Sequence, residues 1–562
     1  MKLHLEGKLL AFGGCYSNLQ ATQALLARAD DLGIRASNII CTGDIVAYGA
    51  DAHATLALIR SAGISVLMGN CEEALSRKAD HCGCGFAPGS VCDALASQWY
   101  AYAAADIDDD DRGYMANLPA DIEVDLAGKK LKFVHGNVDR INAFVFPSAS
   151  HLELKRQIDR TGCDAVIAGH AGIPFTRDLG GKIWHNAGSI GMPANDGTPR
   201  GWFSTIEVCN GDIVITSYPL HYDHQSAAAS MRRARLPEDY AVALETGVWP
   251  SLDILPAFER YFTGTPLEHR QPEGSVPIVP LQRLATLWVN TGTLCNLSCA
   301  NCFMDSTPSN DSLEYFTATD FQAILAQAPA SLGEIGFTGG EPFMNPDIIV
   351  MLECCLQSGL RALVLSNAMR PLQRHKSALM RLIDNYPGRL RIRVSIDHYR
   401  LDEHDTLRGT GSFVQSLDGL KFLETMGLEV SVAARTPWGE TEAMMRHGFA
   451  ELFSGRGIGL NAYEPGDLIL FPEMDVNPGE PMPVTNQALS MLQGDKPLMC
   501  RDSRMVVRRK GEAALSFTPC TLLPGVDIGA SLAEAEAPVA LRYAHCGQFC
   551  VYGGASCAGA PG

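Results

Sequence analysis

The sequence predicts an α/β protein of several domains: a four-layer α/β sandwich, then a partial (β/α)6 barrel, then a cysteine-rich cap. Three observations lead to this prediction. The chain has 562 residues, which is too many for one hydrophobic core. Short strand-like runs alternate with amphipathic helices in residues 1–222 and again in 283–475, which is the pattern of sheets covered by helices. The remaining residues, 476–562, are irregular and rich in Pro, Gly and Cys.

The strand-like runs of residues 1–222 end in polar residues. Because open α/β sheets bind their ligands at the carboxyl ends of the strands, we expect a site there. The runs are LLAFGG, SNIICTGD, GISVLMGN, KLKFVHGN, AVIAGH, IWHNAGS, FSTIEV and IVITSYPL. Residues 223–282 are expected to form a helical segment and a linker, since they end in the Pro-rich stretch TPLEHRQPEGSVPIVP.

Residues 283–475 repeat the alternation of strands and helices. This rhythm implies a parallel sheet that is rolled into a full or partial barrel. The expected strands are LATLWVN, EIGFTGG, RALVLSN, RLRIRVSID, EVSVAAR and GIGLNAY. The cap at 476–562 has little apolar patterning, so we expect its fold to depend on a metal site.

The composition argues against several classes of protein. A net charge of −18 disfavours binding to nucleic acid or to an anionic membrane surface, which needs a basic face. No apolar run is long enough to span a membrane, and the opening MKLHLEGKLLAFGG predicts a first strand rather than a signal peptide. The 18 cysteines cluster at 71–92, 295–302 and 500–557, which indicates metal or iron–sulfur ligation in a reducing cytoplasm.

The stretch LCNLSCANCF places Cys295, Cys299 and Cys302 at the spacing C-x3-C-x2-C, directly after a strand-like run. Three thiolates at this spacing can bind three irons of a [4Fe–4S] cluster and leave the fourth iron open. Structural zinc normally takes four protein ligands, and no fourth Cys or His lies nearby in the sequence. Since active sites lie at the carboxyl ends of barrel strands, we expect this loop to form part of one.

This loop, with Phe303 after its last cysteine, resembles that of the radical S-adenosylmethionine (SAM) enzymes, and FTGGEP at 337–342 resembles their GGEP motif. The resemblance implies that SAM chelates the open iron. One electron, from a donor such as flavodoxin or ferredoxin, then cleaves SAM to give a 5′-deoxyadenosyl radical. The residues that the resemblance implies for SAM binding are Gly339, Gly340, Glu341, Ser366, Asn367, Ser395, Asp397 and, toward its carboxylate, Arg408 or Arg435.

The C-terminal cysteines resemble the auxiliary-cluster extensions, of SPASM or shorter twitch type, that follow many radical SAM barrels. Five cysteines suffice for one [4Fe–4S] cluster and fall short of the seven that are typical of two. A zinc site and unligated thiols are the alternatives, and His545 is a further candidate ligand. The cysteines of this group are Cys500, Cys520, Cys546, Cys550 and Cys557.

The first half of the chain resembles the calcineurin-like metallophosphoesterases, which hold a phosphate between two metals. The motifs that carry the resemblance are GDIVAYG, GNCEE, VHGN, AGH and NAGS, in that order. The resemblance implies that the ligands of one metal are retained, namely Asp44, Asn70, His135 and His170.

The ligands of the other metal are missing. The family opens with Asp-x-His, where this chain has Gly14 and Tyr16, and its GHxH motif is here GHAG, with Gly172 in place of the second histidine. Cys71 stands where a catalytic histidine often follows the Asn. We therefore expect one divalent metal (Mn, Fe or Zn). A metal-free docking domain and a two-metal site with replacement ligands are the alternatives.

Two other sets of residues are left open. Asn18 and Ser189 are expected at the mouth of the phosphoesterase-like site, either as loop caps or as substrate contacts. Four cysteines within 22 residues suit structural zinc or a further iron–sulfur cluster, and reduced buried thiols are an equal alternative. These are Cys71, Cys82, Cys84 and Cys92.

These features predict a radical SAM enzyme that modifies a small, phosphorylated or nucleotide-like metabolite. The first half is predicted to bind or hydrolyse a related ligand. Fast hydrolysis is not expected, because one metal cannot clamp the attacking and the leaving oxygen together. The alternative function is a peptide-modifying radical SAM maturase whose first half is a non-catalytic binding or docking module.

Overall fold

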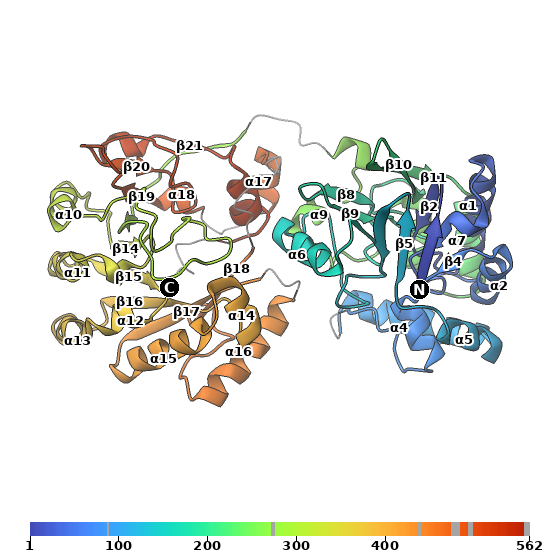
Figure 1. Ribbon diagram of the computed structural model, residues 1–562, viewed down its shortest axis with the longest axis horizontal. Helices are drawn as coiled ribbons and strands as arrows, with labels where there is room; N and C mark the ends of the chain where they lie inside the picture. Colours follow the sequence, from blue (N-terminus) through green and yellow to red (C-terminus); the bar gives the residue numbers. More distant parts are fainter. Residues whose placement is uncertain (87–88, 271–275, 437–439, 474–483, 493–497, 556–562) are drawn as a thin grey trace. The chain divides into compact units, whose positions relative to one another are not determined.

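The computed structural model describes residues 1–86, 89–270, 276–436, 440–473, 484–492 and 498–555. The chain divides into two compact units, Met1–Gln271 (unit 1) and Pro272–Gly562 (unit 2). Both are built from helices and strands, which confirms the predicted α/β multidomain class (Figure 1). None of the helices in the described ranges is both long and apolar enough to cross a membrane.

Unit 1 contains two sheets. The six-stranded sheet has the order β1-β5-β6-β7-β9-β8, with bounds Lys2–Leu5, Ile122–Leu126, Lys129–Phe133, Ala165–Ala168, Ile183–Asn186 and Phe175–Asp178. The five-stranded sheet has the order β11-β10-β2-β3-β4, with bounds Asp212–Leu220, Gly201–Cys209, Leu9–Phe12, Ile39–Cys41 and Ser65–Val66. Within them, β2-β3-β4 and β6-β7-β9 are parallel, so their carboxyl ends lie at one edge of each sheet.

A buried apolar layer joins the two sheets of unit 1. Leu9 and Ile40 of the second sheet cluster with Phe133 and Ile167 of the first, and all are fully or almost fully buried. Helices cover the outer faces through two further apolar clusters. The helices are α1 (Leu19–Asp31), α2 (Ala52–Ala62), α3 (Asn70–Ser76), α4 (Val91–Asp106), α5 (Asp109–Ala116) and α6 (His151–Thr161). The arrangement of helix, sheet, sheet and helix layers confirms the predicted four-layer sandwich.

The segment that follows β11 belongs to unit 1 as far as Gln271. It contains α7 (His224–Arg233), α8 (Glu238–Thr246) and α9 (Ala257–Tyr261). Apolar residues of α7 and α8 lie in the same core cluster as α1, α2 and α4. The part of 223–282 that we predicted as a helical segment therefore packs as an integral layer of the sandwich.

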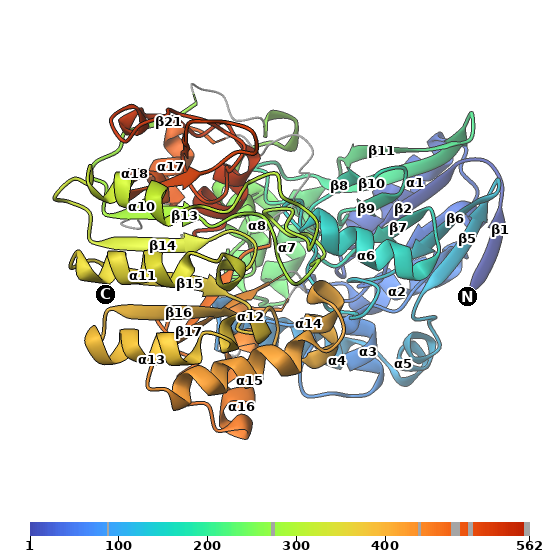
Figure 2. The same cartoon turned by 60° about the vertical axis from the view of Figure 1, so that its left-hand side comes forward.

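Unit 2 is built around one eight-stranded sheet, and Figure 2 shows its strands β13 to β17 one after another. The order is β18-β17-β16-β15-β14-β13-β19-β20, and every pair is parallel except β19 with β20. The strands are Leu468–Phe471, Glu429–Arg435, Leu390–Ser395, Arg361–Ser366, Glu334–Thr338, Thr286–Asn290, Ser503–Val507 and Ser516–Thr518. Because β18 and β20 are not paired with each other, the barrel is open, as predicted.

The helices of unit 2 alternate with these strands. They are α10 (Ala318–Leu325), α11 (Ile348–Gln357), α12 (Arg370–Gln373), α13 (Lys376–Asn385), α14 (Leu401–Arg408), α15 (Ser412–Thr425), α16 (Glu442–Arg456), α17 (Asn486–Leu492) and α18 (Met499–Asp502). A small separate sheet pairs β12 (Ile278–Val279) with β21 (Val539–Ala540).

Two details of unit 2 differ from the sequence predictions. The expected last strand, GIGLNAY, was wrong: residues 457–463 form no strand, and Leu468–Phe471 pairs with β17 instead. A glycine in the left-handed region, Gly457, ends α16 and opens a turn-rich stretch there. The cap also does more than cover the barrel, because β19 extends the sheet directly beside β13.

Candidate functional site

Unit 1 brings together the four predicted metal ligands. Asp44 follows β3 and Asn70 begins α3 after β4, while His135 follows β6 and His170 follows β7. Each sheet thus contributes two side chains at the carboxyl ends of its parallel strands. Asp44 and His170 have left-handed backbone angles, with φ of 58° and 57°. Such strained positions concentrate at functional sites, because surrounding structure must hold them in place.

The ligand atoms of these four residues converge on one point. Nε2 of His135 lies 3.0 Å from Oδ1 of Asn70, 3.2 Å from Oδ2 of Asp44 and 3.2 Å from Nδ1 of His170. All four side chains are almost completely buried.

The hydrogen bonds behind this cluster show that it fits a cation. The Nδ1–H of His135 donates to the carbonyl of Thr42 at 2.6 Å, which leaves Nε2 with its lone pair facing the cluster. The Nδ2 of Asn70 donates to the carbonyl of Cys82 at 3.0 Å, so Oδ1 faces the cluster. Lone pairs of nitrogen and oxygen that face one another repel unless a cation lies between them. The set suits one divalent ion with mixed N and O ligands.

The charges of the cluster shift one another's pKa values. Burial would raise the pKa of Asp44, but the imidazoles of His135 and His170 together lower it well below its usual range. Burial acts against the charged form of His135, and the Asp44 carboxylate outweighs it and raises the pKa. Burial lowers the pKa of His170. The carboxylate of Asp44 is therefore ionised at neutral pH.

Glu72 is a positioning residue that the sequence analysis missed. Its fully buried carboxylate accepts hydrogen bonds from the backbone N–H of Asp44 at 2.8 Å, Val46 at 3.1 Å and Gly69 at 3.0 Å. Burial, followed by the charge of Asp44, raises its pKa to about 7. The available signal was the stretch GNCEE, which places a carboxyl group two residues after the ligand Asn70.

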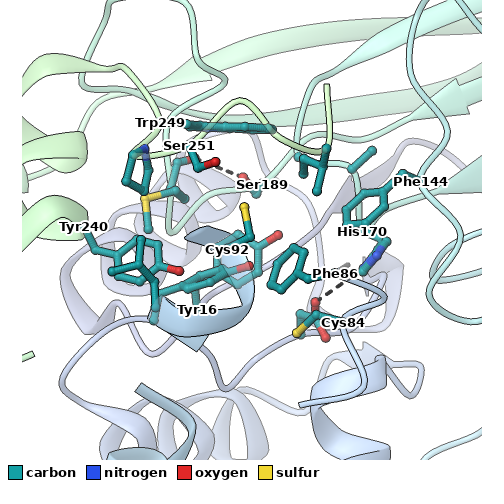
Figure 3. Close-up of a pocket in the computed structure, with 18 residues that line it drawn as sticks. Tyr16, Cys84, Phe86, Cys92, Phe144, His170, Ser189, Tyr240, Trp249 and Ser251 are labelled. Carbon is teal, nitrogen blue, oxygen red and sulfur yellow. Dashed lines mark hydrogen bonds and ion pairs between the residues drawn. The ribbon is translucent and has the colours of Figure 1, made fainter. Parts of the chain in front are cut away.

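The cavity beside the cluster has aromatic walls (Figure 3). A Cβ at Gly14 would lie 2.3 Å from Cζ of Tyr16, so the Tyr16 ring occupies the space of a side chain at position 14. A Cβ at Gly172 would lie 3.4 Å from Cζ2 of Trp249, in ordinary contact with the indole. Neither glycine carries a side chain that could bind a second metal.

The remaining predictions in unit 1 have mixed outcomes. Asn18 caps α1 by accepting from the N–H of Ala21 at 3.0 Å, whereas Ser189 lines the cavity beside the cluster. The four cysteines of the 71–92 group do not form one ligand set, because Cys82 and Cys84 are joined in a disulfide. Cys71 is buried, and its N–H donates to Oδ1 of Asp44 at 3.2 Å.

Unit 2 places most of the predicted SAM-binding residues around one cavity of about 280 Å³. The cavity lies at the carboxyl ends of β13 to β16, as expected for a barrel active site. It is lined by Cys295, Cys299, Cys302, Gly339, Gly340, Ser366, Asn367, Ser395, Arg408 and Arg435. Three thiols with no fourth Cys and no His among the described lining residues are the donor set that an open [4Fe–4S] cluster requires.

The two glycines of the GGEP motif allow a close approach to the cysteine loop. The N–H of Gly340 donates to the carbonyl of Gly292 at 2.7 Å, and a Cβ at Gly340 would lie 2.1 Å from the carbonyl oxygen of Leu294. Gly339 has a φ of 130°, which side-chain-bearing residues rarely adopt. The motif thus fixes the loop that begins at Cys295.

Glu341 does not line the cavity. Its buried carboxylate accepts from Oγ of Ser366 at 2.8 Å and from the N–H of Asn367 at 2.9 Å. Burial raises its pKa to about 7. Glu341 therefore holds the ends of β14 and β15 together, and its contact with SAM stays a prediction.

Asp397 also lies behind the cavity wall. It accepts from Nε and Nη2 of Arg408 at 2.7 and 3.0 Å. Burial alone would raise the pKa of Asp397, but Arg408 and Arg435 lower it to about 2. Arg435 in turn pairs with Glu473 at 2.9 Å, a partner that the sequence did not indicate. Both cavity arginines are therefore held in place by buried carboxylates.

The C-terminal segment reaches the same cavity through Thr521, Leu522 and Phe549. Within it, Cys500, Cys520 and Cys546 are buried, and Cys550 is partly buried. Burial raises the pKa of Cys500 to about 11 and that of Cys546 to about 12. The predicted ligand Cys557 lies outside the described residues.

Comparison with known proteins supports both halves. A family model described as "Radical SAM superfamily" matches residues 289–446, and one described as "Calcineurin-like phosphoesterase superfamily domain" matches residues 8–211. The predicted combination of a phosphoesterase-like domain with a radical SAM domain is thereby confirmed. Residues 289–446 therefore form a radical SAM domain.

Individual relatives match one half or the other. The uncharacterized protein MJ0912 of Methanocaldococcus jannaschii is 27% identical over 42% of this chain and 96% of its own length. The antilisterial bacteriocin subtilosin biosynthesis protein AlbA of Bacillus subtilis is 32% identical over 25% of this chain and 30% of its own length. An AdoMet-dependent heme synthase of Nitratidesulfovibrio vulgaris is 28% identical over 25% of this chain and 36% of its own length. The chain spans only about a third of the two radical SAM relatives.

Proposed function

We propose that unit 2 cleaves SAM reductively and modifies a small metabolite that is phosphorylated or nucleotide-like. The observation that carries this proposal is the single cavity shared by Cys295, Cys299 and Cys302 with the predicted SAM-binding residues. A bound cluster and SAM would supply a 5′-deoxyadenosyl radical, which abstracts a hydrogen from the substrate or adds to it. The chain itself positions the reactants and excludes water.

The charged residues of the cavity suit the carboxylate of SAM. Arg408 and Arg435 each face the cavity while a carboxylate behind them, Asp397 or Glu473, fixes their orientation. A pre-oriented guanidinium loses little freedom when it binds a second carboxylate. Ser395 lines the same wall, where a hydroxyl can contact the ribose.

An acidic electron donor, such as flavodoxin or ferredoxin, fits a basic groove beside the cysteine loop. This open groove, of about 770 Å³, is lined by Asn296 next to Cys295 and by Arg370, Arg374 and His375. No acidic residue is among the described residues that line it. Complementary charge of this kind accelerates docking between proteins.

In the cap we propose one auxiliary [4Fe–4S] cluster, with four ligands among Cys500, Cys520, Cys546, Cys550 and Cys557. In unit 1 we propose one divalent metal, Mn, Fe or Zn, held by Asp44, Asn70, His135 and His170. Without side-chain ligands for a second metal at Gly14 and Gly172, slow phosphodiester hydrolysis is the most that this centre supports, and binding of the ligand is its main role.

The alternative is a peptide-modifying enzyme in which unit 1 is a binding module. The relative named for bacteriocin biosynthesis favours it, whereas the heme synthase favours a small molecule. Genes next to this one discriminate the two: a short precursor peptide supports the first, and small-molecule biosynthesis genes support the second.

The test of the main proposal is anaerobic reconstitution with iron and sulfide, reduction with dithionite and addition of SAM. We expect formation of 5′-deoxyadenosine. If the reconstituted protein bound no SAM, the cysteines of the loop would serve a structural metal site instead.

A further inference from the structure

We infer that unit 1 binds a small planar aromatic ligand, with one donor atom of the ligand on the metal, rather than a phosphate ester held by its phosphate. The inference rests on the proposed one-metal site and names the class of ligand for it. It follows from the walls, the charge and the size of the cavity that opens onto Asp44 and His170.

The cavity walls are aromatic. Figure 3 shows rings of Tyr16, Phe86, Phe144, Tyr240 and Trp249 around one space, with His170 at its edge. The ring of Phe144 lies 4.3 Å from that of His170, at an angle of 31°. The ring of Phe86 is stacked on Phe144 at 6.1 Å. Flat, apolar walls of this kind favour a ligand that presents the face of a ring.

Two of these rings lie next to the positions that lack the family's metal ligands. The Tyr16 ring fills the space beside Gly14, and the Trp249 indole lies against Gly172. Trp249 is fixed there, because its backbone N–H donates to Oδ1 of Asn195 at 2.9 Å and its Nε1–H donates to the carbonyl of Pro193 at 2.7 Å. Its indole therefore offers the cavity only an apolar surface. The aromatic wall thus borders both positions that lack a metal ligand.

Trp249 and Tyr240 come from the helical segment after β11. The phosphoesterase family model ends at residue 211, so these two walls lie outside the part of the chain that it matches. The segment contributes Ser251 and Ile254 to the cavity as well. The helical segment after β11 therefore supplies one wall of the cavity.

The charge of the cavity argues against a phosphate monoester. None of the described residues that line it is Lys or Arg, and its only acidic residue is Asp44. A divalent metal beside one carboxylate leaves a single positive charge for the ligand. A neutral or singly charged donor matches it, whereas a phosphate dianion in an apolar cavity would keep an uncompensated charge.

The size of the cavity limits the ligand to one ring system. Its volume of about 70 Å³ corresponds to roughly five to seven water molecules, at about 10–15 Å³ for each. A cavity of about 150 Å³ holds one benzene molecule, so this smaller cavity admits at most one ring, and the side chains that line it must move to admit a whole one.

The experiment uses the full-length protein loaded with Mn²⁺ and three probes: benzoate, cyclohexanecarboxylate and inorganic phosphate. The first two carry the same donor and charge and differ in planarity. Binding is measured by calorimetry, and a change in the Mn²⁺ electron paramagnetic resonance spectrum reports contact with the metal. We expect benzoate to bind about tenfold more tightly than either other probe.

Variants assign the preference to the rings. Trp249→Leu and Phe86→Leu keep an apolar side chain and remove a ring, so each should reduce the preference for benzoate severalfold. Tyr218→Leu on β11, which does not line the cavity, is the matched control. Mn²⁺ content and melting temperature are recorded for each variant, so that a misfolded variant is recognised and replaced by Phe86→Met.

The outcomes separate this inference from the proposed function. Equal binding of benzoate and cyclohexanecarboxylate, tighter binding of phosphate, or no binding of any probe to the Mn²⁺-loaded protein overturns the inference. Failure of the wild-type chain to take up Mn²⁺, Fe²⁺ or Zn²⁺ overturns the one-metal site itself. SAM cleavage by the same preparation tests unit 2 separately.

Discussion

Replacing Gly340 by alanine is expected to disable the cluster loop through a single steric overlap. The added Cβ would lie 2.1 Å from the carbonyl oxygen of Leu294 and 2.9 Å from that of Thr293. Both atoms are backbone, so neither can rotate away, and the loop that begins at Cys295 must move by roughly 1 Å to restore a normal contact. Overpacking of this kind costs about 1–3 kcal/mol.

The backbone of Gly340 itself does not disfavour alanine, because its φ lies outside the left-handed region. The effect therefore isolates the close approach of the two loops. Gly333→Ala is the matched control, since its Cβ would meet nothing closer than a carbonyl oxygen at 3.9 Å.

The assay is iron content per chain and the rate of 5′-deoxyadenosine formation after anaerobic reconstitution. Gly340→Ala should lower the rate by about tenfold or more, since a displacement of about 1 Å can cost 100-fold in rate. Gly333→Ala should match the wild type. If Gly340→Ala retained full iron content and full activity, the contact between the GGEP motif and the cysteine loop would have no role in positioning.

Four other outcomes are expected. Replacing Cys295, Cys299 and Cys302 together by alanine should abolish 5′-deoxyadenosine formation and lower the iron content from about eight to about four per chain; about four irons with one zinc in the wild type would instead remove the auxiliary cluster. His135→Ala should release the metal of unit 1, as measured by metal analysis after dialysis, and retention of the metal would contradict the ligand set. Burial raises the pKa of Glu259 to about 7. Its protonated form therefore stabilises the fold at low pH, and this contribution is lost as the pH rises from about 4.5 through 7. In urea unfolding, Glu259→Gln should stabilise unit 1 by up to about 3 kcal/mol at pH 8 and have little effect at pH 4.5. Limited proteolysis should cut first within 265–282, and early cuts within 295–345 would argue against that boundary.

The sequence predicted those site residues that come shortly after the end of a strand. Asn70 and His135 come after strands of the two sheets of unit 1, and Cys295 comes after β13 of unit 2, so each lies near the carboxyl end of a parallel strand. The four-layer sandwich was predictable for the same reason, because strand and helix periodicities are local properties of the chain.

The parts that the sequence did not predict depend on contacts between distant residues. Glu473 lies 38 residues from Arg435, and the aromatic wall of unit 1 uses Trp249, which is 77 positions after Gly172. Glu341 belongs to a recognisable motif, yet its motif does not reveal that the carboxylate faces Ser366 and Asn367 rather than the cavity. Local patterns do not encode which of several nearby groups a buried carboxylate will meet.

The pairing of β12 with β21 has a consequence for how this protein can be rearranged. The strand Ile278–Val279, just before the barrel, lies antiparallel to Val539–Ala540, near the other end of the same unit. An early strand and a late strand of this unit are therefore neighbours, and β19 beside β13 ties the late residues into the first strand of the sheet. A module whose early and late strands lie side by side can be spliced between other domains, or circularly permuted, without stretching its interior. A gene fragment that stops at 475 would lack both ties, whereas one that runs from 276 through 555 keeps them.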